Sequence, residues 1–201
     1  TARVRLEADP TQMFRPENIR PTMPPSMQPM KCGLNLSQAP DVGGLRLGMT
    51  VAQAQALFPS LNVSTPSDTG VQSAMLKSGE LNSRPQSRSY FEGVETVALE
   101  FTDGRLSFIR VNYPATNRWG SSDEFVSEIA QKLNIQGTWK RFYDWENKSV
   151  RDIKDLRDQA LECNGFRIVA GIGVEGIGGD QRPHFFFEDM NAIEAVEKRQ
   201  K

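Results

Sequence analysis

Two hairpin motifs constrain the fold of this chain more strongly than any other feature of its sequence. Asp103-Gly104 and Asn164-Gly165 are dipeptides that favour a two-residue turn, because Asn, Asp and Gly tolerate the positive φ angles that such turns require. Apolar residues recur at every second position beside each dipeptide, which is typical of strands that bury one face. The chain is therefore expected to contain an antiparallel sheet with two tight hairpins.

The residues around each turn predict how the strands pair. A two-residue loop places residues at equal distances from the turn opposite one another, and apolar partners then share one face of the sheet. In the second hairpin the same register also sets an acidic residue against a basic residue on the other face. The predicted pairs are Phe101–Leu106 and Leu99–Phe108 in the first hairpin, and Leu161–Ile168, Cys163–Phe166 and Glu162–Arg167 in the second.

A helix signal precedes each hairpin. Thr50-Val-Ala-Gln53 and Ser121-Ser-Asp-Glu124 have the spacing of a capping box, in which two side chains bond to reciprocal backbone N–H groups. Apolar residues follow each box at helical spacing, and Pro59 and Asn134 end the two predicted helices. The apolar stripes are Val51, Ala54, Leu57 and Phe58 in the first helix, and Phe125, Val126, Ile129, Ala130 and Leu133 in the second.

Four further elements are expected. Strands are predicted at 71–77 and 183–188, and a short amphipathic helix is predicted to start at Asp189. Alternating charges with apolar residues at every third position predict a short exposed helix over 147–159. The inward residues of the C-terminal helix are Ile193 and Val196, and its expected ion pair is Glu194 with Lys198.

The order of helix and then strands occurs twice, and the two helix starts are about 70 residues apart. We interpret this as an internal duplication. The sequence therefore predicts an α+β fold of two tandem modules, each a helix packed on an antiparallel sheet, with an extended Pro-rich N-terminal arm. The expected boundaries are 1–40 for the arm, 41–118 for the first module, and 119–201 for the second module with its C-terminal helix.

The N-terminal arm differs in composition from the rest of the chain. It contains 7 of the 12 prolines and 4 of the 7 methionines. Proline fixes φ and removes a hydrogen-bond donor, so the segment is expected to be extended and partly polyproline II. It is either a linker or an arm that lies along a partner protein. The candidate contacts of such an arm are Met13, Phe14, Met23, Met27 and Met30.

The chain has two cysteines, Cys32 and Cys163. A disulfide between them would close a loop of about 130 residues and tie the arm to the body, whereas the alternative is two unrelated buried thiols. A disulfide places the protein in an oxidising compartment, either the periplasm or the outside of the cell. Because the chain starts at Thr1, a preceding signal or anchor segment is compatible with this localisation.

The charge balance bears on the partners. Lys and Arg number 24 and Asp and Glu number 25, so the net charge of -1 gives no reason to expect nucleic acid or an anionic membrane. The longest run of apolar and glycine residues, 168–174, is far shorter than the roughly 20 residues of a spanning helix. We expect one or more protein partners, with a membrane-associated complex as one alternative, and no membrane span in this chain.

Motifs that suggest catalysis each meet a chemical objection. Residues 171–176 match G-x-G-x-x-G, but two more glycines and a proline follow, where a dinucleotide site needs a helix. His184 has no identifiable catalytic partner and is expected to be a packed or edge strand residue. Asp152, Asp155 and Asp158 alternate with basic residues and predict a solvated face rather than a metal site. We therefore predict no cofactor, no metal, no small-molecule substrate and no enzymatic activity.

An aromatic cluster lies within the segment WKRFYDW at 139–145. Aromatic and arginine side chains are enriched at interface hot spots, so the segment is a candidate contact surface. The alternative is a strand whose alternate residues enter the core. The residues of this cluster are Trp139, Phe142, Tyr143 and Trp145.

The stretch LRLGMTVAQAQALF at 45–58 resembles the start of the SmpA/OmlA family, which includes BamE-like envelope lipoproteins. Gly48, Met49, Thr50 and Leu57 occupy the positions of the family pattern. The resemblance implies helices on an antiparallel sheet in an envelope or secreted protein that acts through protein contacts. The tandem arrangement is similar to the β-lactamase inhibitor protein fold. Lipidation and barrel assembly are not implied, because the residues before Cys32 lack a lipobox.

The sequence leads to three functional hypotheses. The first is a non-enzymatic exported protein that binds a partner as an accessory subunit of an envelope or extracellular complex. The second is an enzyme inhibitor that docks through a concave sheet face, with Trp139 or Trp145 in the contact. The third is an enzyme of unknown type that uses His184.

Overall fold

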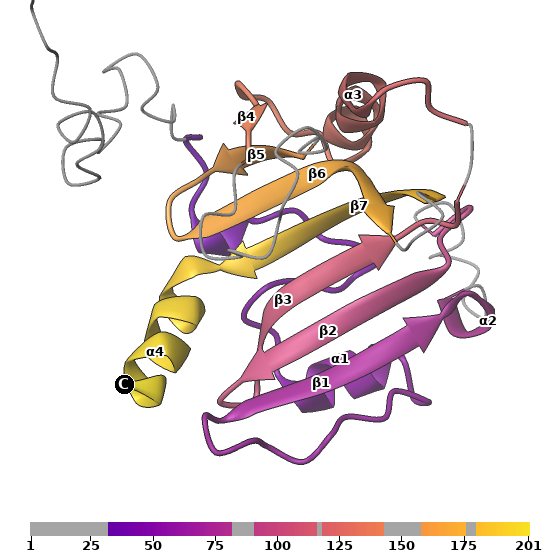
Figure 1. Cartoon of the computed structure of the whole chain (residues 1–201). Coiled ribbons are helices and arrows are strands. Elements are labelled where there is room, and N and C mark those ends of the chain that lie inside the picture. The colour runs from indigo at the N-terminus through magenta and orange to yellow at the C-terminus, as the bar shows by residue number, and fades with distance from the viewer. Residues whose placement is uncertain (1–31, 82–90, 116–117, 143–157, 176–179) are drawn as a thin grey trace, which may run out of the picture.

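One antiparallel sheet forms the centre of the molecule (Figure 1). The computed structural model describes residues 32–81, 91–115, 118–142, 158–175 and 180–201. The sheet has seven strands in the order β1-β2-β3-β7-β6-β5-β4. The strands are β1 (Val71–Lys77), β2 (Thr96–Thr102), β3 (Arg105–Asn112), β4 (Lys140–Arg141), β5 (Gln159–Glu162), β6 (Phe166–Glu175) and β7 (Asp180–Asp189). The predicted strands at 71–77 and 183–188 are confirmed, the second as part of the longer β7.

The three helices predicted to start at Thr50, Ser121 and Asp189 are present with the expected N-terminal caps. The helices are η4 (Leu36–Gln38), α1 (Val51–Leu57), α2 (Ser78–Leu81), α3 (Ser122–Lys132) and α4 (Met190–Gln200). Thr50 and Gln53 form both bonds of a capping box at α1. Ser121 accepts the Glu124 N–H at α3, but the Glu124 carboxylate accepts from the Gly120 N–H, so that box is only half formed. None of the helices in the described ranges is long and apolar enough to cross a membrane.

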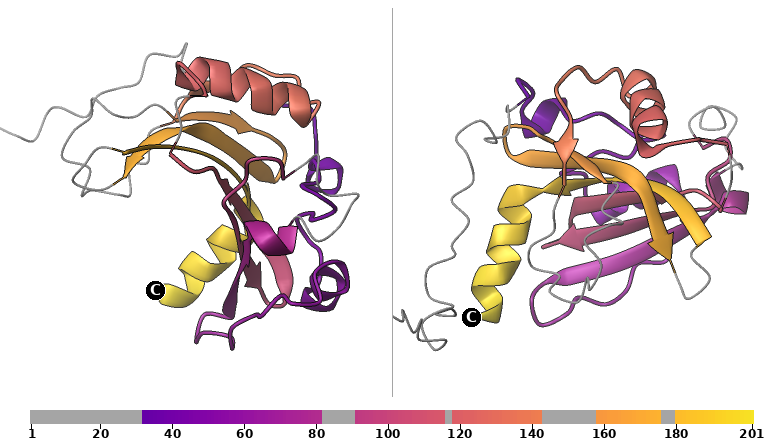
Figure 2. Two further views of the ribbon diagram at one scale, coloured as in Figure 1. Left: turned by 90° about the vertical axis from the view of Figure 1, so that its right-hand side faces the viewer. Right: turned by 45° about the horizontal axis from the view of Figure 1, so that its top comes forward.

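The two faces of the curved sheet differ in what covers them. Helices α1 and α3 lie on its convex side, and α4 lies on its concave side (Figure 2). The convex side carries the core, in which strand residues such as Leu99, Ile109 and Phe187 pack with Ala54 and Phe125 from the two helices. Burial of these apolar side chains is the main stabilising term of the fold. The opposite side, which we call the inner face, is only partly covered.

The two predicted modules share one continuous sheet. Strand β3 from the first half pairs with β7 from the second half, with Ile109 opposite Phe187 and Val111 opposite Phe185. All four of these side chains are buried in one core. The mixed helix and sheet composition is confirmed, whereas a division into two separate modules is not visible in the sheet.

The register of the first hairpin differs from the prediction. Phe101 pairs with Leu106 as expected, and Asp103 and Gly104 have the positive φ angles of the predicted turn, 52° and 72°. Leu99, however, pairs with Ile109 instead of Phe108, because Ser107 is an extra residue that forms a β-bulge. The predicted pair Leu99–Phe108 was therefore wrong.

The bulge is held by the side chain of its extra residue. The Ser107 hydroxyl lies 2.9 Å from the Thr102 hydroxyl and donates to the Glu100 carbonyl at 3.1 Å. Beyond Ser107 the side chains of β3 change faces, so Phe108 and Arg110 point to the inner face. The sequence contains a sign of this shift, since the apolar residues Phe108 and Ile109 are adjacent and break the alternation.

The second hairpin has the predicted register. Leu161 pairs with Ile168 and Glu162 with Arg167, and the Cys163 N–H donates to the Phe166 carbonyl at 2.9 Å. Arg167 forms its ion pair with Glu188 of β7 rather than with Glu162. The expected cross-strand position is thus confirmed, and the ionic partner comes from the neighbouring strand on the other side.

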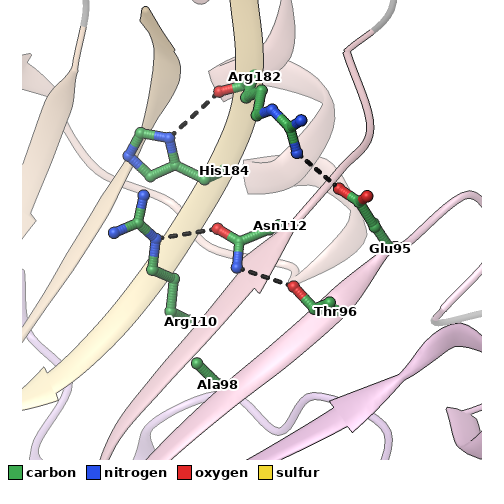
Figure 3. A pocket seen from close by; sticks show the side chains of 7 residues that line it. All are labelled: Glu95, Thr96, Ala98, Arg110, Asn112, Arg182 and His184. Atoms are coloured by element: carbon green, nitrogen blue, oxygen red, sulfur yellow. Dashed lines mark hydrogen bonds and ion pairs between the residues drawn. The ribbon is translucent and has the colours of Figure 1, made fainter. Parts of the chain in front are cut away.

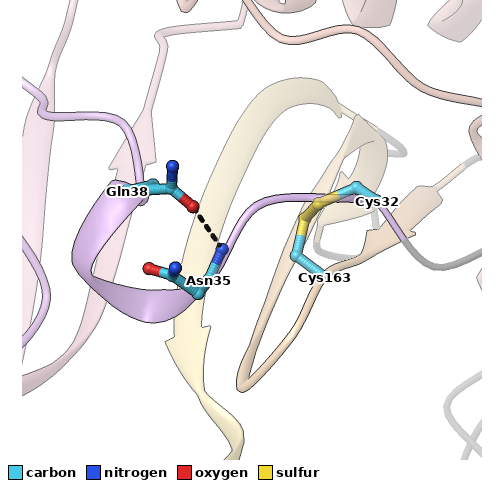
Figure 4. Close-up of a disulfide and its surroundings, with 4 residues drawn as sticks. All are labelled: Cys32, Asn35, Gln38 and Cys163. Atoms are coloured by element: carbon cyan, nitrogen blue, oxygen red, sulfur yellow. Dashed lines mark hydrogen bonds between the residues drawn. A yellow bond between two sulfur atoms is a disulfide. The ribbon is translucent and has the colours of Figure 1, made fainter.

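The predicted disulfide joins Cys32 to Cys163, with their Cα atoms 4.4 Å apart (Figure 4). The chain beside it adds backbone bonds: the Cys32 N–H donates to the Glu162 carbonyl at 2.6 Å, and the Asn164 N–H donates to the Leu34 carbonyl at 2.9 Å. Helix η4 begins shortly after this contact, at Leu36. The predicted arm therefore packs on the body from Cys32 onward, and its residues 1–31 lie outside the described residues.

The outer edge of β1 is occupied by the preceding loop. The Ser64 N–H donates to the Ser73 carbonyl, and the Ser64 hydroxyl accepts from the Ser73 N–H, both at 2.9 Å. Ser67 repeats this with Val71, at 2.8 Å and 3.1 Å. Serine side chains thus bond to ladder groups that an added strand would need, which blunts this edge against strand addition.

Helix α4 has the predicted start and ion pair. Asp189 caps it by accepting the Asn191 N–H at 2.9 Å, and Lys198 lies 2.7 Å from Glu194. Ile193 and Val196 are half-buried rather than core residues. The helix therefore covers one end of the inner face without contributing a fully buried side chain.

Hydrogen bonds join the C-terminal end of α4 to the loop before β1 and to the turn between β2 and β3. The Arg199 guanidinium donates to both oxygens of Asp103, at 2.9 Å and 2.6 Å, and to the Thr69 carbonyl at 2.7 Å. These bonds lower the pKa of the Asp103 carboxyl, with charge attraction as a further cause. The tie joins the last turn of α4 to the turn between β2 and β3.

Tyr113 predicts how stability depends on alkaline pH. Its ring lies in a buried aromatic cluster, 5.3 Å from Trp119 and 5.7 Å from Phe125 between ring centroids. Burial, with a smaller effect of the Glu128 charge, raises the pKa of Tyr113 from 10.0 to about 12. The unfolded chain then loses the phenol proton first, so this contribution to stability is present below pH 10 and is lost as pH rises towards 12.

The test compares thermal unfolding midpoints of the wild type and Tyr113→Phe between about pH 9 and 11. The wild type should lose stability more steeply with pH, because the variant has no phenol to titrate. Equal slopes for the two proteins would contradict the assignment.

Candidate functional site

The inner face carries a row of side chains that runs across five strands. Residues opposite one another in the sheet are Met75 of β1, Ala98 of β2, Arg110 of β3, Phe186 of β7 and Val169 of β6. Met75 is 56% exposed, an unusual state for a large apolar side chain. From Met75 to Phe186 the row therefore combines partly exposed apolar side chains with a central arginine, whereas Val169 at its β6 end is 0% exposed.

Phe186 of this row forms an aromatic pair with Phe108. The Phe108 and Phe186 ring centroids are 5.4 Å apart, and both side chains are half-buried. Phe108 also lies opposite Glu100 in the register, and partial enclosure of Glu100 raises the pKa of its carboxyl. The aromatic pair faces inward only because the bulge at Ser107 shifts the side chains of β3 to that side.

A hollow of about 390 Å³ opens on the inner face, and Figure 3 shows the side chains that line it. It lies towards the N-terminal end of β7, whereas α4 follows the C-terminal end of that strand. It is formed mostly by polar residues of β2, β3 and β7, together with Ala98 of β2 and the residue before β2. Its lining residues are Glu95, Thr96, Ala98, Arg110, Asn112, Arg182 and His184. The neighbouring residues Val97, Ile109 and Val111 are buried in the core. Successive side chains of a strand point to opposite faces, so the same strands supply both the lining of the hollow and the core.

Hydrogen bonds order the floor of the hollow. The Arg110 Nε–H donates to Asn112 Oδ1 at 2.9 Å, and Asn112 Nδ2 donates to the Thr96 hydroxyl oxygen at 3.1 Å. At the rim, Arg182 forms an ion pair with Glu95 at 3.0 Å. The bond from Arg110 fixes which end of the Asn112 amide is the acceptor.

His184 lies in the wall of the hollow and is 7% exposed. Its Nε2 is 3.3 Å from Asp158 Oδ2, and its Nδ1 is 3.4 Å from the Arg182 carbonyl oxygen. The ring lies parallel to Phe186, with centroids 6.2 Å apart. Asp158 Oδ1 is buried and has no hydrogen-bond partner among the described residues. Asp158 was predicted to lie on a solvated face, whereas its side chain is 23% exposed and paired with His184.

The glycine fingerprint makes room for this histidine. Gly171 lies opposite His184 in the sheet, and a Cβ atom at Gly173 would be 3.2 Å from His184 Cε1. Both glycines belong to β6, where they pair with β7. The strand that follows Asn164-Gly165 thus continues through this motif to Glu175, and its glycines leave room for an imidazole ring.

This arrangement offers fixed charges and hydrogen-bond donors rather than an activated nucleophile. Thr96 carries the one hydroxyl among the seven lining residues, and it accepts a bond from Asn112. His184 is directed at Asp158 and at the Arg182 carbonyl. Such groups suit the recognition of a polar group on a ligand or partner.

The two described members of the predicted aromatic cluster, Trp139 and Phe142, are not among the lining residues of the hollow. Trp139 is partly buried and packs against the core. Phe142 is half-buried under the Arg167 guanidinium, whose carbon is 4.6 Å from the ring centroid. Trp139 therefore fits the core interpretation of the segment, and Phe142 takes part in a cation–π contact.

Other predicted sites lie outside the described residues. These are the arm contacts Met13, Phe14, Met23, Met27 and Met30, the cluster members Tyr143 and Trp145, the carboxylates Asp152 and Asp155, and residues 147–157 of the predicted exposed helix. Of that helix segment, Asp158 and Gln159 are described, and Gln159 begins β5.

The sequence analysis identified His184 but none of its neighbours in the hollow. A signal was present in part: Thr96, Arg110 and Asn112 are the polar partners in alternating strands, and alternation predicts that they share the face opposite the core. These residues lie next to His184 only because β3 pairs with β7. In that pairing Asn112 lies opposite His184, which is 72 positions further along the chain.

Comparison with known proteins identifies no family. No family model matches the chain, and no curated protein matches it. Among solved structures, a cysteine-rich secretory protein from Staphylococcus aureus subsp. aureus Mu50 is similar over 73% of this chain and 46% of its own length, at 10% identity and a TM-score of 0.38. The chain thus spans less than half the length of that protein. A similarity of this size supports no conclusion about function.

Proposed function

We propose that this protein is an exported, non-enzymatic binding subunit that contacts a partner protein through the inner face of its sheet. The observation that carries the proposal is the row from Met75 to Phe186, which lies on the side of the sheet opposite α1 and α3 and includes the 56% exposed Met75. Aromatic and arginine residues dominate binding energy at protein interfaces, and here Phe108, Phe186 and Arg110 lie next to one another. The blunted edge of β1 favours a contact through the face over strand addition.

The Cys32–Cys163 disulfide supports export. Disulfides persist in oxidising compartments, so a periplasmic or secreted location is part of the proposal. The resemblance of residues 45–58 to the SmpA/OmlA family points to the same kind of protein. A partner within a membrane-associated complex fits this location, and the proposal includes no nucleic acid, cofactor or small-molecule substrate.

The proposal includes an origin by duplication of a helix-and-sheet module. The sequence of elements α1, β1, β2, β3 has a counterpart in α3, β5, β6, β7. In the sheet, both sets run outward from the central β3–β7 pair in the same relative order. An approximate twofold relation of this kind supports two modules that have merged into one sheet.

Site-specific photo-crosslinking tests the proposed function. A benzophenone amino acid at position 75 should give one defined adduct in material from the source organism, because Met75 lies in the proposed contact. The matched control places the same group at position 56, an exposed site on α1. Against the crosslinked partner, Met75→Ala combined with Phe186→Ala should weaken binding by at least about tenfold.

Two results would count against the proposal. One is an adduct that forms equally well from position 56. The other is a partner affinity that the double substitution leaves unchanged while the variant stays folded. The inhibitor hypothesis uses the same concave face, and it would be favoured if the crosslinked partner were an enzyme that loses activity in the complex.

A further inference from the structure

The side chain of Glu100 in β2 lies on the inner face and has no ionic or hydrogen-bond partner among the described residues. The side chain reaches solvent, but neighbouring atoms partly enclose its carboxylate, and this loss of hydration raises the pKa of Glu100. A carboxylate that is partly removed from water without a counter-charge costs free energy. A cation that contacted Glu100 would therefore gain a favourable interaction.

A second row of inner-face side chains runs through Glu100. In the register it leads from Glu100 to Phe108 of β3, then to Glu188 of β7 and Arg167 of β6. Phe108 thus lies between two carboxylates that belong to the strands on either side of it. Arg167 pairs with Glu188, and Glu100 has no equivalent partner in the described part of the chain.

The pairing of Glu188 shows how this sheet neutralises such a carboxylate. The Arg167 Nε–H donates to Glu188 Oε1, and the guanidinium carbon of Arg167 lies 4.6 Å from the Phe142 ring centroid. The guanidinium therefore contacts both a carboxylate and an aromatic face, which attract it. Glu100 and Phe108 bring the same two chemical groups together on adjacent strands without a guanidinium.

Basic side chains of neighbouring elements are directed to other groups. Arg110, which follows Phe108 on the same face of β3, donates its Nε–H to Asn112, two residues further from Glu100. The Arg199 guanidinium at the end of α4 is bonded to Asp103. A counter-charge for Glu100 would therefore come from another molecule.

We infer that the partner protein inserts an arginine side chain at this position, with its guanidinium bonded to the Glu100 carboxylate and stacked on the Phe108 ring. This inference rests on the proposed function, since it names a group on the partner that the inner face contacts. Ala98 lies two residues before Glu100 on the same face, and the 56% exposed Met75 lies opposite Ala98. These two side chains would pack against the aliphatic stem of the arginine.

An arginine fits this position better than a lysine or a metal ion. A guanidinium is more weakly hydrated than an ammonium and stacks on aromatic rings, so it loses less hydration energy beside Phe108. Calcium and magnesium prefer several oxygen ligands, whereas the neighbours of Glu100 on this face include the apolar residues Ala98 and Phe108.

The experiment uses ethylguanidinium as a probe for the arginine side chain. NMR of the full chain at neutral pH follows the Glu100 carboxyl and Phe108 ring resonances, and ethylammonium, N-ethylurea and calcium are compared at the same ionic strength. Ethylguanidinium should cause saturable shifts at both residues, with weaker responses to the other three. Glu100→Gln, which removes the charge and keeps the shape, should weaken ethylguanidinium binding by about tenfold.

Matched controls exclude general effects of charge and composition. Glu92→Gln removes a carboxylate at an exposed site in the turn before β2 and should leave probe binding unchanged. Phe108→Leu removes the aromatic face and should weaken binding of ethylguanidinium more than that of ethylammonium. Phe142→Leu is its control and should have no effect, because Arg167 already contacts that ring. The inference would be overturned by equal responses to N-ethylurea, by tighter binding of calcium or ethylammonium, or by unchanged probe binding in folded Glu100→Gln.

Failure of this inference can be distinguished from failure of the proposed function. In the complex with the crosslinked partner, Glu100→Arg should weaken binding, and replacing the matching arginine of the partner with glutamate should restore it. If Glu100→Arg has no effect while substitutions at Met75 and Phe186 still weaken the complex, the arginine site is wrong and the contact face stands. If the probe binds but none of these substitutions affects the partner, the contact face is wrong, although the guanidinium site stands.

Discussion

Replacing Phe187 with alanine is expected to lower the free energy of unfolding by about 3–5 kcal/mol, the usual cost of removing a buried phenylalanine ring. Phe187 is 0% exposed and lies where the two halves of the sheet meet. It is opposite Ile109 of β3 and Ile168 of β6, so its loss leaves a cavity between strands from both halves. Urea unfolding measured by fluorescence and circular dichroism gives the value.

Phe186→Ala is the matched control for this substitution. It removes the same ring from the neighbouring position of β7, which points to the half-buried inner face. Its cost should be below about 2 kcal/mol, because less apolar surface leaves the solvent there on folding. Both variants should unfold in a single transition. Separate transitions for the two halves, or equal costs for the two substitutions, would contradict a shared core at the β3–β7 junction.

Removal of the disulfide by the double substitution Cys32→Ser and Cys163→Ser should destabilise the protein by up to about 5 kcal/mol. The two cysteines are 131 positions apart, and the chain-entropy model gives this value for a loop of that length. The effect acts mainly on the unfolded chain, whose freedom the crosslink restricts. Urea unfolding of the variant and of the oxidised wild type, both without reductant, measures the difference.

Reduction of the wild type provides the internal check. A reducing agent should lower the wild-type midpoint to that of the double variant and leave the variant itself unchanged. Coincident midpoints for oxidised wild type and variant would show that the crosslink contributes nothing. A loss well below the model value would indicate residual structure in the unfolded chain, which the crosslink then restricts less.

The elements that could be predicted are those with local signals. Capping residues such as Thr50 and Ser121 act on N–H groups three residues away, and the dipeptides at 103–104 and 164–165 act on the strands that they join. The pairing of Cys32 with Cys163 was predictable because the chain offers no other cysteine. These signals require no knowledge of how distant segments meet.

The arrangement of the halves and the hollow could not be predicted in the same way. The β3–β7 pairing is a contact between strands far apart in sequence, and no motif in either strand indicates that the two strands pair. The contact of His184 with Asp158 requires β5, β6 and β7 to lie side by side, with Gly171 between them. The glycines suggested a nucleotide loop from their spacing, although their role depends on a side chain of the next strand.

The extra residue in β3 shows how backbone length can determine a binding surface. If Ser107 were instead an ordinary strand residue paired with Glu100, alternation would direct Ile109 and Val111 to the concave side and send Phe108, Arg110 and Asn112 towards the helices. The bulge therefore determines which face a whole column of side chains occupies without altering any of them. Among proteins with this architecture, gains and losses of β-bulges would be a direct route to new partner specificity. Comparisons that align residue types while ignoring such bulges would overlook that change.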